Sequence, residues 1–269
     1  MTETLLYYGL SQMPFQKDTR YKSLYQGEDA QQLRNRLEYL KNTKGVGVIT
    51  GSPGSGKTAA IREFTKGLNP ALYKVIYIQM SSVSINEFLR MLASGLGLEP
   101  SFRKSDLFRQ IQEEIEYQVN EKRCIPVAII DEAHYLSHSI LRDLVMLLNF
   151  EMDSKDCCIL LLCGTSLLAR NLRQSNNEAL RQRILVSYQM QGLTFKEAKE
   201  YIEYCLKQCG AKEPVFAPNA VEAVYKASQG VVRKMNSLLT RALIEGANQD
   251  KRLIDSEIIK LAYEDGELD

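Results

Sequence analysis

The sequence predicts an α/β fold in which a parallel five-stranded sheet carries helices on both faces and is followed by a small all-helical domain. Two observations predict this class. From residue 45 to residue 190, short apolar runs alternate with helical patterns, which is typical of a parallel sheet wrapped by helices. After Gly192 the strand signals stop, and helical patterns alone continue.

The strands are expected where short apolar runs are bounded by glycine, polar or charged residues. The third of them is almost wholly apolar, as a strand that is covered on both faces should be. The five expected strands span residues 45–50, 73–79, 124–131, 157–163 and 184–189.

Helices are expected where apolar residues recur with the helical period, between the strands and after them. Thr194 and Glu197 fit a capping box, and Asp255 fits an N-cap for the last helix. The expected helices span residues 56–66, 84–94, 105–120, 139–149, 166–174, 194–209, 218–228, 231–248 and 255–263.

The composition excludes several classes of protein. Of the 269 residues, 45% are hydrophobic and 25% are charged, which is typical of a soluble globular protein and not of a disordered, collagen-like or disulfide-stapled chain. The longest apolar run, residues 157–163, is too short to span a membrane, and residues 1–10 lack the basic start of a secretory signal. We therefore expect a cytoplasmic protein without a membrane segment.

The net charge is close to zero. The chain has 34 basic and 33 acidic residues, for a formal net charge of +1. The field of one copy is too weak for tight binding of nucleic acid, so any DNA contact is expected from a small patch that oligomerisation repeats.

The six cysteines form no CxxC pair. Cys205 and Cys209 share a helix face, and only His134 and His138 could complete a metal site with them. The tetrahedral ligand spacing of zinc sites is missing, so buried free thiols in a reducing compartment are expected, with a zinc site as the alternative. The two histidines have H-x-x-x-H spacing, but we expect His134 to contact phosphate or the backbone beside the site, and His138 has no evident role.

Residues 51–58 read GSPGSGKT and match the phosphate-binding P-loop pattern G-x-x-x-x-G-K-[ST]. Glycines let backbone N–H groups turn toward phosphate oxygens, and the helix that starts here adds its free N–H groups. Lys57 can reach the β- and γ-phosphates of ATP, and the Thr58 hydroxyl can ligate Mg²⁺. A chance match is the alternative, but the loop follows an expected strand and opens an expected helix. The residues expected to bind the nucleotide are Gly51, Ser52, Pro53, Gly54, Ser55, Gly56, Lys57, Thr58 and Ala59.

An apolar strand ends in the carboxylate pair Asp131 and Glu132. Parallel strands deliver their carboxyl ends to the ligand crevice, where Asp131 can hold Mg²⁺ and Glu132 can polarise the water that attacks the γ-phosphate. Two acidic residues could also simply begin a loop. The spacing from the phosphate loop leaves room for one intervening strand, which favours the catalytic interpretation.

At this point the residues resemble the AAA+ superfamily of P-loop NTPases, and within it the ExeA-like group. Residues 131–134 (DEAH) resemble its Walker B motif, and residues 180–184 (LRQRI) resemble the segment that supplies an arginine finger. Residues 230–236 (GVVRKMN) resemble its sensor 2 motif, and residues 8–15 resemble an N-terminal segment that lies near the adenine.

The resemblance implies roles for three further residues. Arg183 would act as an arginine finger on the ATP of a neighbouring copy, and Arg233 would act as sensor 2; a solvated surface cation is the alternative for each. Thr165 occupies the sensor 1 position, where the group has glutamine or asparagine. In the same motif as Arg233, Val232 replaces a proline.

The resemblance also implies a division of the chain. Residues 1–44 would be an N-terminal segment that packs near the nucleotide, residues 45–192 the AAA+ α/β nucleotide-binding domain, and residues 193–269 a helical lid domain. The chain would assemble with itself into a ring or a filament with a hexamer-like turn.

The group splits into secretion ATPases with a membrane span and compact ATPases of the IstB and TniB kind, which serve a transposase. Because the ATPase unit fills this chain, we expect an ATP-dependent ATPase that binds double-stranded DNA and selects or prepares target DNA for a transposase. Alternatives are a cytosolic ATPase of a secretion or pilus system, a replication or repair loader, and a nucleotide-gated switch, against which Glu132 argues. Arg103 and Lys104, in an expected interhelix loop, are the candidate DNA contacts; a solvated loop is the alternative there.

Overall fold

The computed structural model describes residues 2–16, 21 and 25–266, so residues 1, 17–20 and 22–24 of the expected N-terminal segment and residues 267–269 of the expected lid domain lie outside it. The chain divides into two compact units. One unit comprises Met1–Gln31, Ser52–Gly56 and Gln191–Asp269, and the other comprises Gln32–Gly51 and Lys57–Met190. The N-terminal residues and five residues of the phosphate loop thus belong to the same unit as the C-terminal helices.

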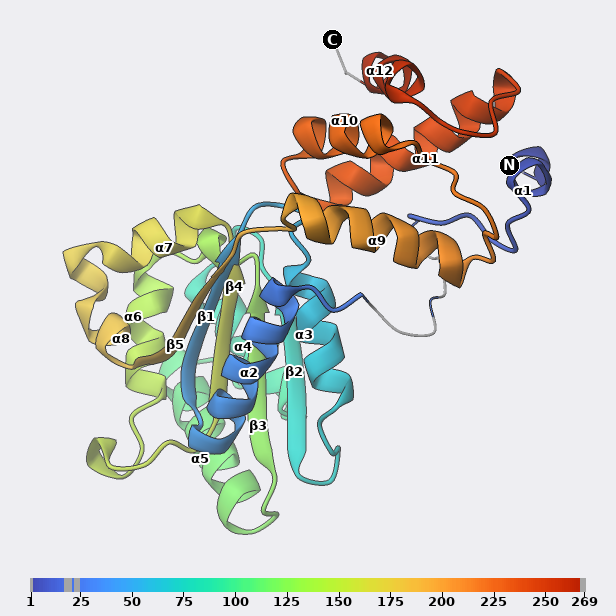
Figure 1. Ribbon diagram of the computed structural model, residues 1–269. Helices are drawn as coiled ribbons and strands as arrows, with labels where there is room; N and C mark the ends of the chain where they lie inside the picture. The colour runs from blue at the N-terminus through green and yellow to red at the C-terminus, as the bar shows by residue number, and fades with distance from the viewer. Residues whose placement is uncertain (1, 17–20, 22–24, 267–269) are drawn as a thin grey trace. The chain divides into compact units, whose positions relative to one another are not determined.

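The second unit is built on a parallel sheet in the order β2-β3-β4-β1-β5, as Figure 1 shows. All five expected strands are confirmed, with ends that shift by two residues at most. β1, β3 and β4 are buried along nearly their whole length, because they lie between neighbours and under helices. The strands are β1 (Gly45–Gly51), β2 (Tyr73–Gln79), β3 (Ile125–Asp131), β4 (Ile159–Gly164) and β5 (Ile184–Met190).

Helices cover both faces of this sheet, as expected (Figure 1). One face is covered by α2 (Glu28–Thr43), from Gln32 onward, and by α3 (Lys57–Lys66). The other face carries α4 (Ile85–Gly95), α5 (Lys104–Asn120), α6 (His138–Leu147), α7 (Ser166–Arg173) and α8 (Glu178–Gln182).

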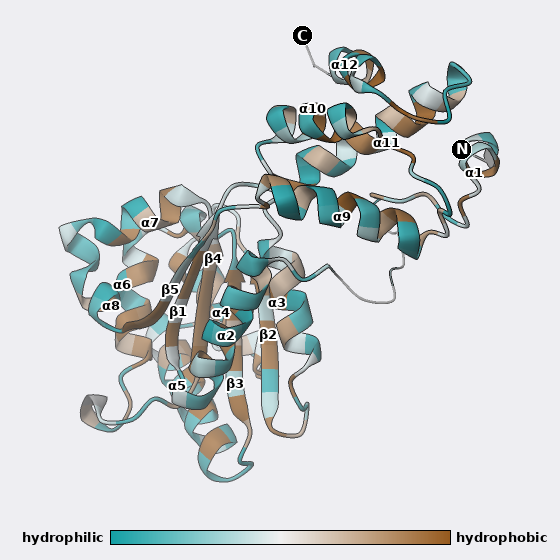
Figure 2. Ribbon diagram, in the orientation of Figure 1, coloured by the Kyte–Doolittle hydropathy of each residue, from teal (hydrophilic) through white to brown (hydrophobic). Residues whose placement is uncertain are grey.

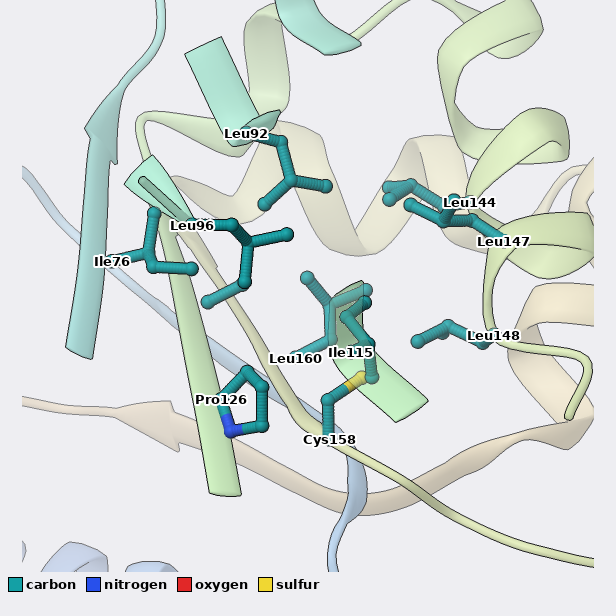
Figure 3. Close-up of a pocket in the computed structure, with 11 residues that line it drawn as sticks. Ile76, Leu92, Leu96, Ile115, Pro126, Leu144, Leu147, Leu148, Cys158 and Leu160 are labelled. Atoms are coloured by element: carbon teal, nitrogen blue, oxygen red, sulfur yellow. The ribbon is translucent and has the colours of Figure 1, made fainter. Parts of the chain in front are cut away.

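The core between the sheet and the second helical face is tightly packed. Figure 2 shows the central strands as strongly hydrophobic, and Figure 3 shows a small gap beneath α4, α5 and α6. This cavity has a volume of about 20 Å³ and is lined by aliphatic side chains and Cys158. A water molecule needs polar partners, so the cavity stays dry. The strands that carry the site are therefore held by a rigid core.

The first unit is helical. Its core joins α9 (Phe195–Gln208), α10 (Pro218–Ser228), α11 (Val232–Asn248) and α12 (Ser256–Glu264), the four helices expected after the sheet. The N-terminal segment adds α1 (Thr2–Tyr8) and buries three apolar side chains in the same core: Leu10, Met13 and Phe15.

Local capping in this unit follows the sequence prediction. The Thr194 hydroxyl accepts the N–H of Glu197, whose carboxylate accepts the N–H of Thr194 at 2.9 Å. The same carboxylate accepts the N–H of Glu28 at 2.6 Å, which ties the start of α2 to α9. Asp255 accepts two N–H groups at the start of α12, as predicted.

Candidate functional site

The phosphate loop joins the carboxyl end of β1 to the first turn of α3. Gly54 and Gly56 have φ values of 83° and 102°, a region that favours glycine. Ser52 accepts the N–H of Ser55 at 3.1 Å and closes a turn. Among the described residues, the buried Ser55 hydroxyl has no hydrogen-bond partner. A buried hydroxyl without a partner is costly unless a ligand supplies one.

Lys57 and Thr58 occupy the first turn of α3. Lys57 is buried, and its Nζ donates to the carbonyl of Gly51 at 2.8 Å. The Thr58 Oγ1 donates to Oδ2 of Asp131 at 3.2 Å. The fold thus brings together two residues that the sequence analysis assigned to one site and that lie 73 positions apart.

Asp131 ends β3 and is 5% exposed. Besides Thr58, its Oδ2 accepts a hydrogen bond from Tyr77 Oη at 2.7 Å, and its Oδ1 accepts the backbone N–H of Glu132 at 2.9 Å. Burial, and then the bond to this carboxylate, raises the pKa of Tyr77 well above its usual value. The hydroxyl therefore stays a donor at ordinary pH.

Tyr77 was not among the site residues predicted from the sequence. The available signal was its place in the expected strand at residues 73–79, two positions before Gln79. Gln79 pairs with Asp131 in the parallel ladder between β2 and β3, and residues two apart on a strand point to the same face. That signal requires knowing that β2 is the neighbour of β3.

Glu132 follows Asp131 with a φ of 54°, a left-handed conformation that is unusual for a residue other than glycine. Such strain is typical of functional positions. Its Oε2 lies 3.4 Å from Nδ1 of His134, without hydrogen-bond geometry between them. The expected contact of His134 with phosphate or the backbone stays a prediction, and the structure places the ring beside the Glu132 carboxylate.

Thr165 follows β4, the strand between β3 and β1. It is the N-cap of α7, although its side chain makes no capping hydrogen bond. A Cβ added to the preceding Gly164 would lie 3.3 Å from the backbone nitrogen of His134. The end of β4 is therefore packed against η1 (Ala133–Tyr135), directly after the acidic pair.

Arg233 is the second residue of α11 and lies against the phosphate loop within the first unit. Its backbone N–H donates to the carbonyl of Gly54 at 3.2 Å. A Cβ on Gly54 would lie 2.4 Å from the Cβ of Arg233. The structure therefore brings the backbone of this residue to the loop and adds a reason for glycine at position 54, while the sensor 2 role of the Arg233 side chain stays a prediction.

Arg183 lies at the other end of the sheet. It precedes β5, whose first residue, Ile184, pairs with Val46 at the amino end of β1. The phosphate loop follows the carboxyl end of this seven-residue strand, about 20 Å away at about 3.3 Å per residue. The guanidinium of Arg183 donates to the carbonyl of Leu148 at 3.4 Å. Arg183 is thus too far away to contact a phosphate bound by Lys57 of its own chain.

Arg103 and Lys104 are the N-cap and the first residue of α5, where an interhelix loop was expected. Lys104 forms an ion pair with Asp143 of α6, a carboxylate that the sequence analysis did not place here. Nearby, Phe102 is 88% exposed, and the guanidinium of Arg90 lies 6.0 Å from its ring centre. Arg103 is therefore the less neutralised of the two candidate DNA contacts.

The cysteines are free thiols, as expected. Five are buried, and burial raises the pKa of Cys158 to about 12 and that of Cys205 to about 11. In the described part of the chain, no group of three or more His, Cys, Asp or Glu side chains is arranged to hold a metal. Nδ1 of His138 lies 3.1 Å from the side-chain amide of Asn177.

The donor set around Asp131 fits a magnesium-bound nucleotide. A hydroxyl and a carboxylate are hard oxygen ligands of the kind that Mg²⁺ prefers. The unpartnered Ser55 hydroxyl and the left-handed glycines form a cradle that a Cβ would fill at Gly54. Thr58 and Asp131 would hold the metal.

Comparison with known proteins gives a family match and several similar proteins. The family described as AAA domain matches residues 40–172. General secretion pathway protein A of Aeromonas hydrophila is 29% identical over 263 residues, which cover 96% of this chain and 48% of that protein. ATP-dependent target DNA activator B of Escherichia phage Mu is 31% identical over 121 residues, 45% of this chain and 36% of that protein.

Among solved structures, Cdc6p from Pyrobaculum aerophilum superposes with a TM-score of 0.68 at 17% identity, over 93% of this chain and 70% of that one. This likeness shows the fold. The chain spans about half the length of the first curated relative and about a third of the second. No helix of the described residues is both long enough and apolar enough to cross a bilayer.

The fold and the site define a P-loop NTPase with a helical C-terminal region. Residues 40–172 match the family described as AAA domain, and the chain is similar to a general secretion pathway protein and to a target DNA activator.

Proposed function

We propose that the chain binds ATP with Mg²⁺ at the phosphate loop, hydrolyses it between assembled copies, and uses the cycle to select or prepare double-stranded DNA for a transposase. The observation that carries the ATPase part is the hydrogen bond between Thr58 and Asp131, 3.2 Å long, beside the buried Lys57. It joins the end of the phosphate loop to the carboxyl end of β3, which β4 separates from β1.

The residues of the phosphate loop have different proposed roles in binding ATP. Backbone N–H groups of the phosphate loop, except at Pro53, which has none, and of the first turn of α3 donate to the phosphate oxygens. Lys57, whose Nζ donates to the Gly51 carbonyl, is the proposed partner of the β- and γ-phosphates. Thr58 and Asp131 would hold Mg²⁺, and the metal would supply positive charge to neutralise the transferred phosphoryl group.

Glu132 is the proposed base. Its carboxylate is 43% exposed beside the buried Asp131, so it can orient a water at the carboxyl end of the sheet. Thr165 and Arg233 are the proposed sensors, and the contact of Arg233 with Gly54 supports its part. The burial of Leu10 and Phe15 in the unit that contains Ser52–Gly56 supports a place for the N-terminal segment near the nucleotide.

Hydrolysis would need a second copy. Arg183 lies at the amino end of the sheet, far from its own phosphate loop, and a charged residue there can serve a γ-phosphate only on a neighbour. This supports a ring or a filament as the active form, with residues 193–269 acting as the lid.

The proposed DNA role is supported by the similarity to a phage protein whose name is ATP-dependent target DNA activator B. A second candidate, an ATPase of a secretion or pilus system, is favoured by the longer match to general secretion pathway protein A. A transposase gene or a secretion gene beside the coding sequence would distinguish the two.

The direct test is binding of labelled duplex DNA with ATP, ADP or no nucleotide, read together with phosphate release. We expect ATP-dependent binding that is nearly independent of sequence and falls steeply with salt. Hydrolysis without any DNA binding across a salt titration would contradict the DNA role and leave the secretion alternative.

A further inference from the structure

We propose that Tyr77 is a positioning residue for the magnesium site: its hydroxyl holds the Asp131 carboxylate in the orientation that receives the metal. The proposal rests on the proposed ATPase function. It concerns a residue outside the phosphate loop and the acidic pair, on the strand at the edge of the sheet.

The contact is short and well placed. The Tyr77 hydroxyl donates to Oδ2 of Asp131 at 2.7 Å, and the Thr58 hydroxyl donates to the same oxygen at 3.2 Å. The other oxygen, Oδ1, accepts the N–H of Glu132 at 2.9 Å. When Thr58 turns its oxygen to a metal, Tyr77 and the Glu132 amide remain as donors that fix the carboxylate plane.

The register of the sheet explains why this tyrosine reaches the site. Tyr77 pairs with Ile129, two residues before Asp131, so both side chains point to the face that α3 covers. β2 is the edge strand, and Tyr77 is 49% exposed there. The ring therefore lies at the rim of the site and reaches it with its hydroxyl.

The preference of aromatic residues for strands would explain an aromatic ring at this edge, but it would not explain the contact of the hydroxyl with Asp131. Tyr73 provides the comparison, since it lies on the same face of the same strand but pairs with Ile125 at the far end of the ladder. Groups that orient a metal-binding carboxylate typically contribute 10- to 100-fold to metal affinity. We therefore expect a change in magnesium affinity when the hydroxyl is removed.

The experiment is a magnesium titration of the binding of a fluorescent ATP analogue to the full chain. In Tyr77→Phe, we expect the Mg²⁺ concentration at half-maximal response to rise by about tenfold or more, with the affinity in EDTA unchanged. Tyr73→Phe is the matched control and should titrate like the wild type. When Asp131→Asn is already present, Tyr77→Phe should raise the Mg²⁺ concentration at half-maximal response little further.

Two results would overturn the inference. One is a Tyr77→Phe midpoint within about twofold of the wild type, since that change is below the expected contribution of such a group. The other is a shift of the Mg²⁺ midpoint by Tyr77→Phe that is equally large when Asp131→Asn is present, because the hydroxyl would then act on a group other than the Asp131 carboxylate. A wild-type protein whose nucleotide binding ignores magnesium would instead contradict the proposed ATPase function.

Discussion

The substitution Gly54→Ala probes the packing of the phosphate loop against α11. The added methyl group would lie 2.4 Å from the Cβ of Arg233, well inside van der Waals contact, and neither atom is the flexible end of a side chain. The backbone at position 54 also has a φ of 83°, where a side chain costs about 1–2 kcal/mol. That cost alone would reduce the population of the loop conformation that receives phosphate by roughly 5- to 30-fold, and the steric clash adds to the cost.

Relief of the strain requires a shift of the loop or of the start of α11, and a shift of the loop takes it out of the conformation that receives phosphate. We therefore expect Gly54→Ala to bind a fluorescent ATP analogue at least roughly 5- to 30-fold more weakly. Gly67→Ala is the matched control, because its added Cβ meets only the Phe64 carbonyl, at 3.4 Å, and the Glu63 carbonyl, at 3.9 Å. Wild-type affinity in Gly54→Ala, with thermal unfolding unchanged, would refute the reasoning.

Three further predictions follow from the site. Glu132→Gln should keep ATP binding, and its steady-state rate of phosphate release should fall by about 100-fold or more because the attacking water loses its base. Release at the wild-type rate would contradict the role of Glu132 as the base. Arg183→Ala should bind ATP but not hydrolyse it, and mixing with Lys57→Ala protein should restore some activity; no rescue at any ratio would point to Arg181 instead. Arg103→Ala should weaken DNA binding on all sequences and reduce the salt slope by about 1, more than Lys104→Ala does, because Asp143 already neutralises Lys104. Equal salt slopes for Arg103→Ala and the wild type would show that another surface carries the contact.

The sequence predicted the sheet well, because each strand is a short apolar run between punctuating residues. β2 and α10 (Pro218–Ser228) lie where expected to the residue. The N-terminal helices were not predicted. α1 has seven residues, about two turns, which is too short for periodicity to distinguish. α2 buries Leu33, Leu37 and Leu40, whose i, i+4, i+7 spacing is a helical signal that was present in the sequence.

The parts of the site that lie within one continuous sequence motif were predictable. The phosphate loop and the acidic pair each occupy consecutive positions, and the structure brings Thr58 to Asp131. Contacts between distant segments were not predictable in the same way. Tyr77 depends on which strand is the neighbour of β3, and the pairing of Lys104 with Asp143 depends on how α5 packs on α6.

The central claim is that ATP is bound at the phosphate loop and hydrolysed with Asp131 and Glu132. Equilibrium binding and single-turnover hydrolysis of radiolabelled ATP, measured on the same samples, test it most directly. The account predicts that Lys57→Ala loses binding, while Glu132→Gln binds as the wild type does and retains uncleaved ATP. Tight ATP binding by Lys57→Ala, or cleavage by Glu132→Gln at the wild-type rate, would contradict it.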